Sequence, residues 1–160
     1  MAARDTGSPS ERGGVRIILD LIDRHGGIAY TRELSRVPRN VLDVAAWYGT
    51  VLHVKKGVWA APGLDPVVAS AIRAGGRLAC VSALAYHGVI EPGHELHICA
   101  PLGVISWRPR GSRERVVRHW SRRPAPGDRI AVDVETAWAQ FALCRAVAGR
   151  DVRLRRGDSL

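Results

Sequence analysis

Residue types able to bind a metal gather in the middle of the chain. His94, His97 and Cys99 form an H-x-x-H-x-C run. Imidazole nitrogen and thiolate sulfur at close spacing are ligands that zinc accepts. A structural zinc site needs four such ligands, and no second pair follows this run. There is also no phosphate-binding or dinucleotide-binding glycine motif. We therefore expect no metal and no cofactor.

A second group has the residue types of a nucleophile and its base: Cys80, Ser82 and His87. No carboxylate that would orient the histidine is evident, and Ser82 is a natural N-cap for a helix that carries His87. The chain has three cysteines and no C-x-x-C pair. Cys80, Cys99 and Cys144 are therefore predicted to be reduced, small hydrophobic residues. We expect no enzymatic activity.

The net charge points to a polyanionic partner. The 160 residues contain 24 Lys and Arg against 15 Asp and Glu, a formal charge of +9. Residues 1–63 carry 9 basic and 6 acidic residues, net +3, and residues 106–129 carry 8 and 2, net +6. A localised basic stretch favours nucleic acid, with a solvated arginine-rich surface as the alternative.

The sequence shows no sign of a membrane partner. No apolar run reaches the roughly 20 residues that span a bilayer. The first fourteen residues lack the apolar core of a signal peptide. We therefore expect a cytoplasmic protein.

The first part of the chain has the spacing of a small helical domain. Residues 1–13 lack apolar periodicity and are predicted to form a flexible tail. The first helix has apolar residues every three or four positions: Val15, Ile18, Leu19 and Ile22. Thr31 is expected to cap a short second helix over residues 32–36. A third helix is expected over residues 38–48, with these residues toward the core: Val41, Val44, Ala45 and Tyr48.

A hairpin is expected after the third helix. Its strands are predicted at residues 51–54 and 58–61, joined by a turn of Lys55, Lys56 and Gly57. Three helices followed by a hairpin, with a tight break between the second and third helices, are typical of a winged helix-turn-helix. We predict this domain over residues 14–63.

Residues 64–148 are predicted to form a small, helix-rich α+β domain, which makes the whole chain α+β. Its helices are expected at residues 66–74, capped by Asp65, at 82–87 and at 134–147. Strands are expected at residues 96–100 and 115–121, and residues 130–132 have the apolar character of another. Residues 149–160 are predicted to be a second flexible tail.

Four residues of the third helix are candidates for the major groove. Arg39 can donate to guanine or to phosphate, and Asn40 can pair with adenine through two hydrogen bonds. Asp43 can accept from cytosine N4, or it repels phosphate. Trp47 is either a wedge against the bases or, as such tryptophans more often are, a cover over the junction with the hairpin.

Other residues are expected to contact the DNA backbone. Lys55 and Lys56 lie at the expected hairpin tip, where phosphate or minor-groove contacts are favoured over burial. Arg32 and Arg36 can reach the backbone beside the groove. The hydroxyl of Thr31 can bind a phosphate, although capping is the favoured role.

A second basic cluster has no assigned partner. It consists of seven arginines: Arg108, Arg110, Arg113, Arg115, Arg118, Arg122 and Arg123. The cluster can extend the contact with DNA or meet an acidic protein surface. Equally, it can be a loop and edge strand whose charge prevents aggregation.

Several segments together resemble a known family. They are the stretch from Gly26 through the third helix, LHVKKGVWAAPG at residues 52–63, AGGRLACVSALAYHG at 74–88 and LHICAP at 96–101. The chain resembles the AbiEi family of type IV toxin–antitoxin antitoxins and its actinobacterial relatives over residues 14–147. The resemblance implies a winged-helix domain that binds double-stranded DNA and represses its own operon. It also implies a C-terminal domain associated with neutralising a nucleotidyltransferase-type toxin.

Some relatives in that family also carry a nuclease domain. This chain has no acidic-x-Lys nuclease core, because its two lysines both lie in the hairpin. The expected function is sequence-specific repression of transcription, with double-stranded DNA as the partner. The resemblance adds a nucleotidyltransferase-type toxin as a second partner. The alternative is a protein-binding module that neutralises a toxin or another partner without binding DNA.

Overall fold

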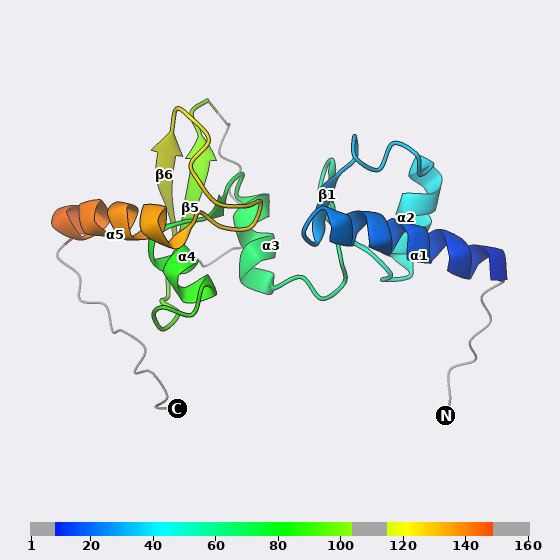
Figure 1. The fold of residues 1–160 in the computed structure, drawn as a ribbon, viewed down its shortest axis with the longest axis horizontal. Coiled ribbons are helices and arrows are strands. Elements are labelled where there is room, and N and C mark those ends of the chain that lie inside the picture. The colour runs from blue at the N-terminus through cyan, green and yellow to red at the C-terminus, as the bar shows by residue number, and fades with distance from the viewer. Residues whose placement is uncertain (1–8, 104–114, 149–160) are drawn as a thin grey trace. The chain divides into compact units, whose positions relative to one another are not determined.

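The computed structural model describes residues 9–103 and 115–148 of the protein (Figure 1). The chain divides into two compact units, an N-terminal unit (Met1–Leu64) and a C-terminal unit (Asp65–Leu160). The division lies one residue after the expected boundary. The described residues form helices and two small sheets, which confirms the α+β class. Among these helices, none has both the length and the apolar character that crossing a membrane requires.

The described residues of the N-terminal unit form two helices and three strands. They are α1 (Pro9–Arg24), β1 (Ile28–Tyr30), α2 (Arg39–Trp47), β2 (Leu52–Lys55) and β3 (Val58–Ala60). The strands are antiparallel in the order β1-β3-β2. Helix α1 begins at Pro9, so the expected tail over residues 1–13 is wrong for its last five residues. Proline is tolerated there because the first N–H groups of a helix have no intrahelical partner.

An apolar core joins these elements. Ile18 and Ile22 of α1 are fully buried, as the spacing predicted, and they pack in one cluster with Leu42 of α2 and Trp59 of β3. Trp59 has no solvent exposure, and its indole Nε1 donates to the hydroxyl of Thr31 at 3.0 Å. The one polar atom of this large side chain is therefore satisfied inside the core.

Residues 31–36 are not the expected second helix. They form consecutive hydrogen-bonded turns, and β1 precedes them. The backbone before the turns is used by the sheet: Ala29 pairs with Trp59, and the N–H of Thr31 donates to the carbonyl of Gly57 at 3.0 Å. Leu34 is buried as expected, so the turns still carry an apolar contact into the core.

The expected core face of the third helix is wrong in part. Leu42 and Ala45 are its buried residues, whereas Val44 is 54% exposed and Tyr48 is 79% exposed. Leu42 and Ala45 pack in the same core cluster, and this packing accounts for the rotation. The carbonyl of Ala45 accepts from the backbone N–H and from the hydroxyl of Thr50, both at 2.9 Å, which closes the C-terminal end of the helix.

The hairpin places its two lysines differently from each other. Lys55 is the last residue of β2 and pairs with Val58, next to an irregularity in the register. The turn consists of Lys56 and Gly57, and Gly57 has a φ of 81°. Glycine adopts such an angle without the steric cost that other residues have. Only Lys56 is therefore at the tip.

In the C-terminal unit, the part of the chain that the structure describes forms a second three-stranded sheet and three helices. They are α3 (Pro66–Arg73), β4 (Arg77–Leu78), α4 (Cys80–Tyr86), β5 (Leu96–Pro101), β6 (Val116–Ser121) and α5 (Val134–Ala148). Strand β5 is central, antiparallel to β4 and parallel to β6. Helix α4 packs on both β5 and α5 (Figure 1). Residues 131 and 132 make only isolated bridges, to Leu78 and Gly127.

The helix starts of this unit show one confirmed cap and one correction. Asp65 caps α3 as expected, accepting from the N–H of Val67 at 2.7 Å. Helix α4 begins at Cys80 instead of Ser82, with Ala79 as its N-cap residue. The hydroxyl of Ser82 instead accepts from the N–H of His97 on β5 at 2.9 Å. The Ser82 hydroxyl, which was expected to cap the helix, is therefore used in a contact with a strand distant in sequence.

Candidate functional site

Two candidate sites emerge, one in each unit, and the first is the exposed surface of α2. Arg39 and Asp43 form an ion pair there, with Nε 3.1 Å and 3.3 Å from the two carboxylate oxygens. The guanidinium carbon also lies 5.0 Å from the centre of the Trp59 ring. Both members of the pair are about half exposed. Two residues expected to contact different bases are therefore partners of each other.

Asn40 and Trp47 both point away from the core. Asn40 is exposed, and Trp47 is 87% exposed. The favoured role of Trp47, covering the junction with the hairpin, is therefore wrong. Trp59 is the tryptophan that fills that place, since it belongs to β3 and is buried against α1 and α2.

The residues before α2 have partners of their own. The Thr31 hydroxyl accepts from Trp59, so its expected capping role is wrong. The guanidinium carbon of Arg32 lies 5.0 Å from the centre of the Tyr30 ring, a cation–π contact. Arg36 is exposed. Both arginines keep access to solvent next to the start of α2.

The hairpin contributes one exposed cation at its tip. Lys56 is exposed, while Lys55 is half-buried, and burial lowers the pKa of its ammonium group. The expectation that Lys55 stands free of the core is therefore wrong. His53 of β2 is exposed and stacks on Trp59, with ring centroids 4.4 Å apart. Sequence reasoning missed His53, although its alternation with buried Val54 places it on the outer side of the strand.

The second basic cluster does not form one surface in the described residues. Arg108, Arg110 and Arg113 lie outside them. Arg115 pairs with Glu95 at 3.3 Å. Arg118 is half-buried, and two of its nitrogens have no hydrogen-bond partner in the described part of the chain. Arg122 and Arg123 are exposed.

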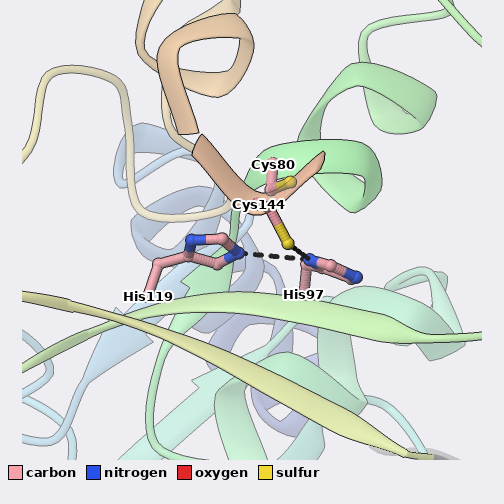
Figure 2. Close-up of side chains that lie close together, drawn as sticks. All are labelled: Cys80, His97, His119 and Cys144. Atoms are coloured by element: carbon pink, nitrogen blue, oxygen red, sulfur yellow. Dashed lines mark hydrogen bonds between the residues drawn. The ribbon is translucent and has the colours of Figure 1, made fainter. Parts of the chain in front are cut away.

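The second candidate site lies inside the C-terminal unit. Four side chains converge there from four elements: Cys80 of α4, His97 of β5, His119 of β6 and Cys144 of α5. Figure 2 shows the two histidines rising from the strands toward the two cysteines. Each residue offers one possible ligand atom, and these four atoms all lie within 4.8 Å of one another.

His97 is the centre of this group. Its Nδ1 lies 3.1 Å from Nε2 of His119 and 4.0 Å from Sγ of Cys144 (Figure 2). Its other ring nitrogen, Nε2, lies 3.6 Å from the carboxylate of Glu95. The parallel register pairs Cys99 with His119, so the side chains of His97 and His119 share one face of the sheet.

Burial shifts the pKa values of two members of this group, His119 and Cys80. It lowers the pKa of His119 to about 4, with the nearby His97 as a second cause. Near neutral pH this imidazole is therefore uncharged and keeps a lone pair. Burial also raises the pKa of the Cys80 thiol, and of the Cys99 thiol nearby. The described cysteines are all free, as expected.

The structure separates the residues that the sequence grouped. Of the H-x-x-H-x-C run, only His97 belongs to the cluster, because His94 is exposed and Cys99 lies outside it. Ser82 and His87, which were grouped with Cys80 as a nucleophile and its base, bind separate parts of the backbone. Ser82 binds the backbone of β5, and Nε2 of His87 lies 2.9 Å from the carbonyl of Val132.

The sequence analysis missed His119 and Cys144 as possible metal ligands. The four cluster residues are separated by 17 or more positions, so no local spacing connects them.

Compared with known proteins, the chain matches no family model and no curated protein. The resemblance to the antitoxins therefore remains a prediction.

Proposed function

We propose that the N-terminal unit is a winged helix-turn-helix that binds double-stranded DNA sequence-specifically and represses transcription in the cytoplasm. The observation that carries the proposal is the order of its elements. Helix α1, strand β1, the turns, helix α2 and a hairpin follow one another, and β3 lies between β1 and β2. In a winged helix this order leaves the second helix of the motif and the hairpin tip available to DNA.

Helix α2 supplies the groups for reading bases. Asn40 is exposed and can make two hydrogen bonds to adenine. Arg39 is held by Asp43, and an exposed pair of this kind is worth only about 0.2–1 kcal/mol. Guanine or a phosphate can therefore displace Asp43 at little cost. Until then, Asp43 and the Trp59 ring limit the orientations that the Arg39 guanidinium adopts.

The backbone contacts come from cations on either side of α2. Lys56 stands at the hairpin tip, and Arg32 and Arg36 are exposed in the turns before the helix. Each phosphate that such a cation neutralises adds about −0.9 to the slope of log K against log salt concentration. Lys55 contributes less because it is half-buried.

The test compares the protein's own upstream DNA with scrambled DNA of equal length at two salt concentrations. Lys56→Ala is expected to weaken binding to both sequences and to reduce the salt slope by about one phosphate. Arg16→Ala is the matched control, since it removes one exposed positive charge from α1 and should change neither. Asn40→Ala should cost about 1–3 kcal/mol on the upstream DNA alone. Equal affinity of the unaltered protein for both sequences would sink the proposal.

A second function is supported by the apolar surface of α2. Val41 is 36% exposed and Val44 54%, and Trp47 and Tyr48 continue this surface at the end of the helix. Exposed apolar patches of this kind mark protein contacts. The antitoxin resemblance suggests a nucleotidyltransferase-type toxin as the partner, and under this alternative the N-terminal unit does not bind DNA.

The two functions respond differently to substitutions on α2 and at the hairpin tip. If α2 contacts a toxin, Trp47→Ala lowers affinity for the nucleotidyltransferase-type product of a neighbouring gene, and Lys56→Ala does not. If α2 reads DNA, Asn40→Ala lowers the affinity for upstream DNA and leaves the affinity for scrambled DNA unchanged. Isothermal titration with each partner measures both effects on the same three proteins.

A further inference from the structure

We propose that Cys80, His97, His119 and Cys144 bind one zinc ion that joins α4 and α5 to the sheet of the C-terminal unit. The proposal is independent of DNA binding. It rests on the convergence of two thiols and two imidazoles from four elements, with all four ligand atoms within 4.8 Å of one another.

The distances suit a tetrahedral ion after a small contraction. Zinc bonds of 2.0–2.3 Å place tetrahedral ligand atoms about 3.3–3.8 Å apart. Nδ1 of His97 and Nε2 of His119 are 3.1 Å apart, and Nδ1 of His97 and Sγ of Cys144 are 4.0 Å apart. The widest separation, 4.8 Å, closes with side-chain shifts of about 1 Å or less.

The orientation of His97 favours a metal. Its Nε2 faces the carboxylate of Glu95 at 3.6 Å, and its Nδ1 faces the cluster. A carboxylate behind a ligating histidine is the usual means of fixing its tautomer and ring orientation. The hydroxyl of Ser82 accepts from the N–H of His97, and the His97 carbonyl accepts from the N–H of Ala79. The imidazole is thus fixed from its backbone and from its outer nitrogen.

The backbone of Cys80 supplies an independent observation. Its φ is 49°, the one positive value that a residue other than glycine has in the described chain. This left-handed conformation costs an L-residue about 1–2 kcal/mol, and such strain gathers at ligand and active sites. The N–H of Cys80 donates to the side-chain oxygen of Gln140 on α5 at 3.0 Å. The strained residue is therefore held against the helix that carries Cys144.

The ligand types select the ion and its role. Thiolates with imidazoles in a tetrahedral set are typical of zinc, whereas magnesium and calcium need oxygen ligands. Four protein ligands leave no open position for water or substrate, so the site is structural. Cys80 and His97 are buried, and an ion there would contribute binding free energy to the fold of the unit.

The experiment uses the full chain, without a histidine tag, under reducing conditions. We expect one zinc per chain by elemental analysis, and Co²⁺ in its place should give the intense visible bands and thiolate charge transfer of a tetrahedral S₂N₂ site. Zinc should raise the melting temperature of the metal-free protein by more than about 5 °C. A chain that binds no zinc and gives no tetrahedral cobalt spectrum overturns the proposal.

Variants separate this cluster from the local H-x-x-H-x-C run. Cys144→Ser and His119→Gln should each lower zinc affinity by at least about 100-fold, more than the loss of a residue that only orients a ligand. Glu95→Gln, which alters such an orienting residue, should lower it by about 10-fold. Cys99→Ser and His94→Ala are matched controls and should keep one zinc at unchanged affinity.

Two further results would contradict the proposal. The first is an equal loss of zinc from Cys99→Ser and Cys144→Ser, which would place the ion elsewhere. The second is a Cys80–Cys144 disulfide that forms in the purified protein and persists when zinc is supplied under reducing conditions. Because the cobalt spectrum is read on the unaltered chain, the test stands even if a cysteine variant fails to fold.

Discussion

The two units of this protein use their polar residues in opposite ways. In the N-terminal unit the described core is apolar, with Ile18, Leu42 and Trp59 fully or almost fully buried, and α2 carries its ionic pair on the surface. In the C-terminal unit Cys80 and His97 lie inside, between two helices and two strands. An apolar core leaves function to the surface, whereas buried thiols and imidazoles need partners where they are.

That difference predicts different responses to substitution, and the largest concerns Trp59. Trp59→Ala removes a side chain with no solvent exposure and leaves the Thr31 hydroxyl without its donor. We expect the free energy of unfolding of the N-terminal unit to fall by about 3–5 kcal/mol. Trp47→Ala, the same change at an 87% exposed position, should alter it by less than about 0.5 kcal/mol.

Hydrogen exchange measures this effect unit by unit. Amides of residues 14–64 should lose protection in Trp59→Ala, and amides of residues 65–103 should keep it. An equal loss in both ranges would mean that the units unfold as one, and the contrast between two independent cores would be lost.

In the C-terminal unit, the position where we expect a substitution to lower stability is a glycine. A Cβ on Gly76 would lie 2.5 Å from the carbonyl oxygen of Cys99 and 3.2 Å from Cβ of Ile98. Because the first of these atoms is backbone of β5, Gly76→Ala must displace the strand that carries His97. We expect a loss of about 1–3 kcal/mol in the free energy of unfolding.

Gly63→Ala is the control for this substitution, since a Cβ there meets no atom within 4 Å. Urea unfolding of both variants measures the difference. If Gly76→Ala is as stable as Gly63→Ala, β4 and β5 are not packed as closely as the structure has them.

A smaller effect is expected on the surface of α2. Asp43→Asn removes the ion pair with Arg39 and one negative charge facing the proposed DNA. The stability of the unit should change by less than about 0.5 kcal/mol, because exposed pairs contribute little. DNA affinity should rise by about 2–10-fold as repulsion of phosphate is relieved. Fluorescence anisotropy with upstream DNA measures this change. Weaker binding by the variant would contradict the expectation and would mean that Asp43 holds Arg39 in the orientation that contacts DNA.

The smallest effect concerns pH and the start of α5. Hydrogen bonds from the hydroxyl and the backbone N–H of Thr136 lower the pKa of Asp133 below its usual 3.8. A carboxyl whose pKa is lower in the folded state adds stability above the unfolded pKa, and this is lost as the pH falls through the folded value. Asp133→Asn keeps an acceptor without the charge.

The variant should therefore be slightly less stable than the original protein at pH 7. The two should become equal as the pH falls below about 3.8 and through the folded pKa. Thermal unfolding followed by circular dichroism across this range measures the difference. A gap that stays constant down to the lowest pH would assign the effect to cap geometry instead of charge.

Sequence patterns predicted most elements of the fold, and their failures have a common cause. Ile18 and Ile22 are buried as their spacing required, and Asp65 caps α3. The rotation of α2 was wrong because Val41, Val44 and Tyr48 fit a helical face as well as Leu42 and Ala45 do. The tertiary packing of Leu42 and Ala45 in the cluster that holds Trp59 decides between these faces.

The two candidate sites differ in how far the sequence predicts their residues. The exposed residues of α2 and the lysine at the hairpin tip could be named from the sequence, because a helix face and a turn are local structures. The pairing of Arg39 with Asp43 across one helical turn was also within reach of the sequence, because residues four apart on a helix are neighbours.

The sequence by itself determined which residues are apolar, where glycines and capping residues end the elements, and that no local run of histidines and cysteines makes a complete metal site. Only the tertiary structure decided that Cys80, His97, His119 and Cys144 meet. The parallel pairing of β5 with β6 and the packing of α4 on α5 bring them together across 64 positions of the chain, from residue 80 to residue 144. Contacts over such separations follow from packing, which no short pattern records.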